Sequence, residues 1–166
     1  ATCDSDYMGI YLIELDQTDK VLFNNKVSVN YNDSLPETAW VNNNLVMSWR
    51  TPDNIYLKKY NSGVVSDIAT FPKVDSGIWS NKLVKLDDNR ALLSWVDRDN
   101  FTDSSKIYFS IYDGANSNFS TPSVLMNDNE LFPIYNLTSL SNNKIVVMHC
   151  GNTVDVPTEQ VIYDLN

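Results

Sequence analysis

Residues 86–127 read LDDNRALLSWVDRDNFTDSSKIYFSIYDGANSNFSTPSVLMN, and this stretch decides the fold. A polar turn precedes an apolar run that ends in Trp95, and a polar loop then leads to an alternating run that begins at Ile107. A turn containing Gly114 and one more short run close the unit. Alternation of apolar and polar residues is typical of a half-buried strand, so the stretch predicts an antiparallel β-meander.

Two markers of this unit recur along the sequence of 166 residues. An Ile-Tyr pair appears four times, as Ile10-Tyr11, Ile55-Tyr56, Ile107-Tyr108 and Ile162-Tyr163. A mostly apolar run follows each Asn- or Asp-rich turn, as LVMSW at 45–49, ALLSW at 91–95 and IVVMH at 145–149. These runs predict strands buried on both faces. At their ends, we expect Trp49, Trp95 and His149 to pack between units rather than to form a ring of ligands.

Weaker runs before and after the two markers complete one all-β repeat domain, 1–166. We expect a partial unit at 1–35, two four-stranded antiparallel units at 36–75 and 76–130, and a second partial unit at 131–166. The pattern predicts about thirteen strands and no helix, because the helical period never persists over about 11 residues.

Four-stranded meanders that repeat roughly every 40 to 55 residues are typical of β-propeller blades. The chain resembles the broad class of bacterial and extracellular β-propeller repeat proteins, whose units run from a turn through an apolar strand ending in Trp to an alternating strand and a Gly turn. The resemblance implies a β-propeller-like fold with about three blades, whereas closed propellers have about 4–8. We therefore expect a homo-oligomer or the remainder of a larger propeller to complete the ring. The alternative is a β-sandwich with coincidental repeats.

The charge and the cysteines limit the partners and the compartment. A formal net charge of −9 makes nucleic acid and membrane surfaces poor partners. Cys3 and Cys150 predict a disulfide, within one molecule or between two, with two unpaired thiols as the alternative. The start at Ala1 is compatible with a processed or a trimmed N-terminus. We expect a secreted protein, extracellular or periplasmic.

Four residues are candidates for ligand binding. Arg50 and Arg98 both lie just past an apolar strand and could clamp the carboxylate of a sialic or uronic acid, with ordinary salt bridges as the alternative. Trp40 and Trp79 lie beside Asn and Asp residues, a pattern typical of sugar stacking, although packing within a unit is equally expected.

Three carboxylates are candidates for a calcium site. We place Asp97, Asp99 and Asp103 in the loop after Trp95, where alternating oxygen ligands suit Ca²⁺. Phe101 replaces the third oxygen ligand and no Gly follows, so a solvated acidic loop is the alternative. The sequence predicts no other cofactor.

The sequence favours a non-catalytic binding or assembly module that recognises carbohydrate or protein through its loops. One alternative is an enzyme of the glycoside-hydrolase or lyase type, with Asp97, Asp99, Glu37 and Tyr135 as candidates by elimination. A structural subunit whose task is oligomerisation is the other alternative.

Overall fold

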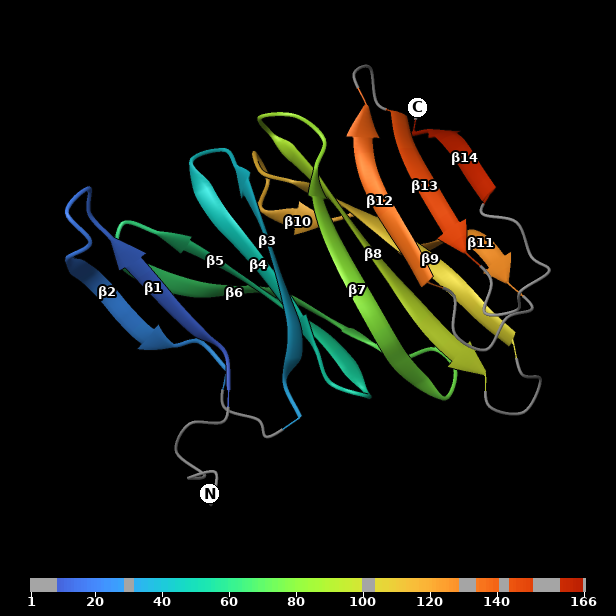
Figure 1. The fold of residues 1–166 in the computed structure, drawn as a ribbon, viewed down its shortest axis with the longest axis horizontal. Coiled ribbons are helices and arrows are strands. Elements are labelled where there is room, and N and C mark those ends of the chain that lie inside the picture. The colour runs from blue at the N-terminus through green and yellow to red at the C-terminus, as the bar shows by residue number, and fades with distance from the viewer. Residues whose placement is uncertain are drawn as a thin grey trace.

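The computed structural model describes residues 9–28, 32–99, 104–128, 134–140, 144–150 and 159–165, and its regular elements are all strands (Figure 1). The described strands form four antiparallel sheets, each built from consecutive segments of the chain. This confirms the predicted all-β class with antiparallel sheets. Within the same residues, no helix is long and apolar enough to cross a membrane.

The sheets follow one another in sequence order. The first sheet pairs β1 (Tyr11–Leu15) with β2 (Val21–Lys26). The second is a meander of β3 (Ser34–Val41), β4 (Asn44–Arg50), β5 (Asn54–Asn61) and β6 (Val64–Pro72). The third contains β7 (Gly77–Lys85), β8 (Arg90–Asp99) and β9 (Ser104–Asp113), with β10 (Asn118–Phe119) and β11 (Ser123–Asp128) both paired to β9. The fourth contains β12 (Ile134–Leu140), β13 (Lys144–Cys150) and β14 (Glu159–Asp164).

Tight turns join the strands of the second sheet. Asn42 and Asn43, between β3 and β4, have φ values of 47° and 59°. Asn tolerates this left-handed region, and a turn with positive φ at both central residues matches the twist of the flanking strands. Ser62 and Gly63 make the equivalent turn between β5 and β6, with φ values of 48° and 86°. Turn formation therefore explains the placement of these Asn residues.

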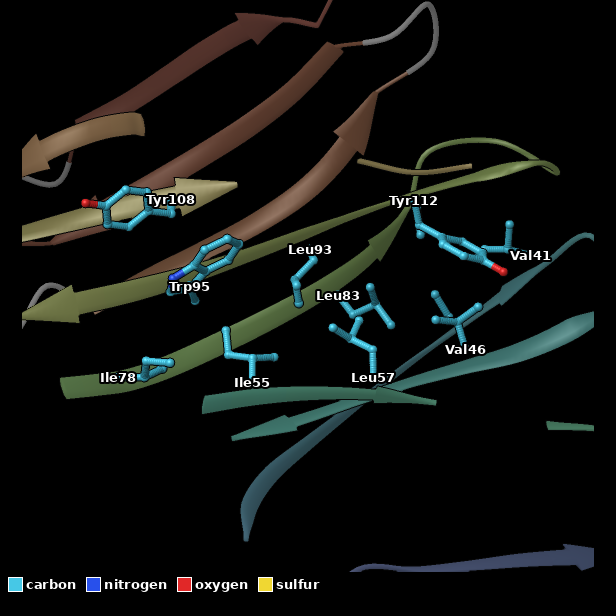
Figure 2. Packing of buried hydrophobic residues seen from close by; sticks show 12 residues of the cluster. Val41, Val46, Ile55, Leu57, Ile78, Leu83, Leu93, Trp95, Tyr108 and Tyr112 are labelled. Atoms are coloured by element: carbon cyan, nitrogen blue, oxygen red, sulfur yellow. The ribbon is translucent and has the colours of Figure 1, made fainter. Parts of the chain in front are cut away.

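A hydrophobic core lies between each pair of consecutive sheets. The second and third sheets enclose the core drawn in Figure 2, where Leu93 and Trp95 of β8 face Ile55 and Leu57 of β5. A second core lies between the third and fourth sheets, and a third between the first and second sheets. The four sheets are thus stacked face to face in sequence order, with β1 and β2 at one end and β12, β13 and β14 at the other (Figure 1).

The second strands of the two central sheets are buried on both faces, as the sequence predicts. In β4, Met47 packs toward the first sheet and Val46 toward the third. In β8, Leu93 packs toward the second sheet and Leu92 toward the fourth. Trp49 and Trp95 are also buried in these cores, which confirms their packing role.

Buried polar pairs add directional contacts between sheets. The amide of Asn81 on β7 donates to Ser48 Oγ on β4, at 3.1 Å. The hydroxyls of Ser94 on β8 and Tyr135 on β12 lie 3.2 Å apart. Because a buried hydroxyl or amide without a partner is costly, these pairs fix how one sheet sits on the next. The first strands β3 and β12 both contact β7, so the first strands of three sheets lie next to one another.

Replacing Trp95 with Ala should lower the free energy of unfolding by roughly 3–5 kcal/mol, because the indole stacks on Phe71 of the second sheet and on Tyr108 of its own sheet. Trp79 is 44% exposed and supplies a matched control, for which we expect a loss below about 1 kcal/mol. Urea unfolding of both variants measures the difference. Equal losses would contradict the role of Trp95 in joining the sheets.

Tyr135 should make the stability depend on pH in the alkaline range. Burial raises its pKa to about 12, although the hydrogen bond with Ser94 partly offsets the effect. In the unfolded protein, the phenol ionises from about pH 10, so the contribution of Tyr135 is complete below pH 10 and is lost between about 10 and 12. Tyr135→Phe removes this dependence. The free energy of unfolding of the wild type, measured relative to that of the variant, should therefore fall by up to roughly 3 kcal/mol between about pH 10 and pH 12. Parallel pH profiles of the two proteins in urea unfolding would contradict this assignment.

Candidate functional site

A cleft of about 330 Å³ opens where the ends of β4 and β8 approach the start of β7. Two arginines from different sheets and one tryptophan meet on it. The described lining residues are Arg50, Pro52, Ser76, Gly77, Ile78, Trp79 and Arg98. None of these described residues is acidic, so the cleft is locally cationic in a protein whose formal net charge is −9.

Arg50 reaches the cleft from the last position of β4. Its Nη1 donates to the carbonyl oxygen of Ile78 on β7, at 2.6 Å, which orients the guanidinium across the joint between two sheets. Its Nε is buried and has no hydrogen-bond partner among the described residues. Burial lowers the pKa of Arg50, because the charged form loses hydration. An anion in the cleft would restore the contacts that Arg50 has lost to burial.

Arg98 and Trp79 form the second half of the cleft. The pairing of β7 with β8 shifts register between Ile78 and Ser80, and Trp79 lies at this irregularity. The guanidinium carbon of Arg98 lies 5.3 Å from the centroid of the indole ring. This cation–π geometry holds a charged group against an aromatic surface that is itself partly open to solvent.

Hydrogen bonds preform the loops around the cleft. The buried carboxylate of Asp97 accepts from the backbone N–H groups of Val74 at 2.5 Å and Asp75 at 3.1 Å. Next to them, the N–H of Ser76 donates to the carbonyl oxygen of Arg98, at 2.8 Å. The N–H of Ile78 donates to the carbonyl oxygen of Pro52, at 2.9 Å, and so ties the loop after β4 to β7. These hydrogen bonds fix the backbone that surrounds the cleft.

The expected loop position of Asp97 and Asp99 is wrong, because β8 extends to Asp99. Asp97 is fully buried, and one of its oxygens accepts hydrogen bonds from the loop before β7. The side chain of Asp99 and all of Asp103 lie outside the described residues. Among the residues that are described, no group of three or more His, Cys, Asp or Glu side chains could hold a metal ion. The calcium site stays a prediction.

Trp40 lies away from the other three predicted ligand-binding residues. It pairs with Leu45 at the start of β4, whereas Arg50 is at the end of that strand. Trp40 lines a separate cleft of about 440 Å³, together with Asn42, Asn43, Lys85, Asp88 and Asn89. The structure thus brings together Arg50, Arg98 and Trp79, and it places Trp40 at the opposite end of the sheets.

The loop residues that line the first cleft were not predicted from the sequence. Pro52 follows β4, and Ser76 precedes β7, so each belongs to a connection whose path depends on tertiary contacts. The Ser76-Gly77 pair at the start of β7 was the available signal, because small residues allow close approach of the backbone.

The residues named for an enzymatic site do not gather. Glu37 accepts from Lys82 Nζ at 2.7 Å, and Tyr135 is buried against Ser94. Asp97 is buried under the loop before β7. Of the predicted disulfide, Cys3 and the side chain of Cys150 lie outside the described residues, and only the backbone of Cys150, at the end of β13, is placed. The disulfide stays a prediction.

Comparison with known proteins gave no match, either to a family model or to a curated protein sequence.

Replacing Asp97 with Ala should loosen the loop that borders the cleft. Two backbone N–H groups lose their acceptor, and we expect a cost of roughly 1–3 kcal/mol together with faster amide hydrogen exchange at Val74 and Asp75. Asp67→Ala is the control, because the Asp67 side chain is exposed and pairs only at the surface with Lys58. Unchanged exchange at Val74 and Asp75 in the Asp97 variant would show that the carboxylate does not hold the loop.

Proposed function

We propose that this protein is a non-catalytic recognition module that binds the carboxylate of an acidic carbohydrate in the cleft of Arg50, Arg98 and Trp79. The observation that carries the proposal is the convergence of two guanidiniums from neighbouring sheets on a cleft whose described lining contains no acidic residue. A sialic or uronic acid is the expected ligand class.

The chemistry of the three side chains matches such a sugar. A planar guanidinium forms two parallel hydrogen bonds to a carboxylate, and these are stronger than bonds between neutral groups. The exposed part of the Trp79 indole offers an apolar surface for the C–H groups of a pyranose ring. A volume of about 330 Å³ lies at the small end of the range of ligand sites, which suits one sugar residue rather than a long segment.

The order of the sheets supports a propeller-like arrangement for this module. Four antiparallel sheets follow one another face to face, and the first strands β3 and β12 both contact β7, as inner strands do around a propeller axis. In such an arrangement, the loops at the sheet ends form a rim on which ligands are recognised. Arg50 and Arg98 are both at strand ends that would belong to that rim. A secreted location, extracellular or periplasmic, fits the recognition of acidic glycans.

A protein carboxylate is the alternative ligand, since an Asp or Glu side chain or the C-terminal carboxylate of a partner offers the same charge to Arg50 and Arg98. Trp79 distinguishes the acidic sugar from the protein carboxylate, because the sugar has a ring that stacks on the indole and the carboxylate group alone does not. An enzymatic role is less well supported, because Glu37 is paired with Lys82 and Asp97 is buried, so neither carboxylate lines the cleft.

Titration calorimetry with glucuronic acid and N-acetylneuraminic acid oligosaccharides tests the proposal. Arg98→Gln should weaken binding by roughly 10- to 100-fold, because one charge-assisted contact is lost. Trp79→Ala should weaken binding of these sugars as well. Arg90→Gln is the matched control, because Arg90 pairs with Asp87 near the start of β8 and does not line the cleft.

Neutral oligosaccharides of the same length should not bind. Equal binding of neutral and acidic sugars, or equal losses in Arg98→Gln and Arg90→Gln, would overturn the proposal. Binding of acidic peptides that is insensitive to Trp79→Ala would favour the protein alternative.

A further inference from the structure

The exposure of the Ile-Tyr pairs changes only at the two ends of the stack. In the pairs that begin at 10, 55 and 107, the Ile side chain packs into the core shared with the following sheet. In the pairs that begin at 55, 107 and 162, the Tyr side chain packs into the core shared with the preceding sheet. The two remaining side chains are exposed, Tyr11 by 43% and Ile162 by 58%.

The run on β13 shows the same change on the side that faces away from the third sheet. Met148 occupies the position equivalent to Ser48 and Ser94, which are both fully buried against the next sheet. In the last sheet this position is 41% exposed. Ile162 on β14 pairs with Val146 on β13, so these apolar side chains share one face. We call the exposed side chains of Leu140, Met148 and Ile162 the last face, and Val146 between them is buried.

The first sheet lies at the opposite end of the molecule (Figure 1), and it also carries exposed apolar side chains. Leu12 of β1 packs into the core shared with the second sheet, and the residues on either side of Leu12 point away from that core. Ile13 is 54% exposed, and Leu15, Val21 and Leu22 are exposed as well. We call Tyr11, Ile13, Leu15 and Leu22 the first face. Contiguous exposed apolar side chains on a sheet face are typical of an interaction surface.

We propose that the last face of one copy of this protein packs against the first face of a second copy. In every core between consecutive sheets, the earlier sheet contributes the face that carries the Ile of its Ile-Tyr pair, and the later sheet contributes the face that carries the Tyr. At the two ends of the stack, one face that carries an Ile, Ile162, and one face that carries a Tyr, Tyr11, are exposed. The two faces are therefore the two halves of one more interface of the same construction. Like-to-like packing of two first faces would not reproduce it.

The position of β14 determines the form of this contact. β14 pairs with β13 over 144–149, so it already occupies the edge of β13 that β1 of another copy would need. β1 of another copy therefore cannot pair with β13, and the proposed contact is made by the sheet faces instead. Two copies supply eight sheets, from four each, within the range of about 4–8 blades of closed propellers. A head-to-tail contact that closes in this way gives a ring of two copies with two identical joints.

Sedimentation analysis in reducing buffer tests the contact without a contribution from a disulfide. At about 100 μM the wild type should have the mass of two copies of 18.9 kDa, because standard interfaces hold with micromolar or tighter affinity. Ile162→Asp and Ile13→Asp should each raise the dissociation constant by at least about 100-fold, because an unpaired carboxylate would be buried. Val64→Asp is the control for an exposed apolar residue outside both faces and should leave the mass unchanged.

Mixing the two variants distinguishes head-to-tail packing from like-to-like packing. A pair made of one Ile162→Asp copy and one Ile13→Asp copy has one joint in which both faces are wild type, so dimers should reappear in the mixture. This recovery also shows that both variants are folded. A monomeric wild type, a dimer that survives both substitutions, or a mixture that stays monomeric would overturn the proposal. The contact does not involve the Arg50 cleft, so its failure would leave the ligand proposal untouched.

Discussion

Burial of the second strand of a sheet on both faces is the constraint on which the rest of this structure depends. Leu92 and Leu93 of β8 are adjacent in sequence, point to opposite sides and are both fully buried. A sheet with such a strand at its centre needs another sheet on each side, since no solvent-facing surface can accommodate it. Repetition of the same strand type in β4 extends the stack, and the loops, which border the proposed binding cleft, are left at the ends of the strands.

The periodicity of apolar residues was sufficient to predict the strands and the turns, because both depend on local chemistry. Asn42 and Asn43 take positive φ, as expected for an Asn turn, and the run that ends in Trp95 is buried on both faces. The pairing of β10 and β11 with the same strand β9 was not predictable, because it depends on the path of a loop around Gly114. Close packing of Gly114 against Asn42 of the neighbouring sheet is a tertiary contact without a local signal.

The candidate site was predictable only where it is built from strand ends. Arg50 and Arg98 come together because the strands that carry them end on the same side of neighbouring sheets. The position of Asp97 in a strand could not be predicted, because a carboxylate in a polar sequence indicates a loop unless its hydrogen-bond donors are known. Those donors are the N–H groups of Val74 and Asp75, about twenty residues earlier in the sequence, and they allow a buried carboxylate to replace an apolar side chain.

The charge of the whole protein and the charge of the cleft act over different distances. With a net charge of −9, the molecule repels an acidic ligand at long range, but ions in solution screen this repulsion beyond a Debye length of about 8 Å. Inside the cleft, Arg50 is partly desolvated and its charge is screened less, so its attraction would act on the proposed carboxylate ligand at short range. An acidic protein can thus hold an acidic ligand when burial concentrates two guanidiniums at one point, whereas the same arginines on an open surface would be offset by the surrounding carboxylates.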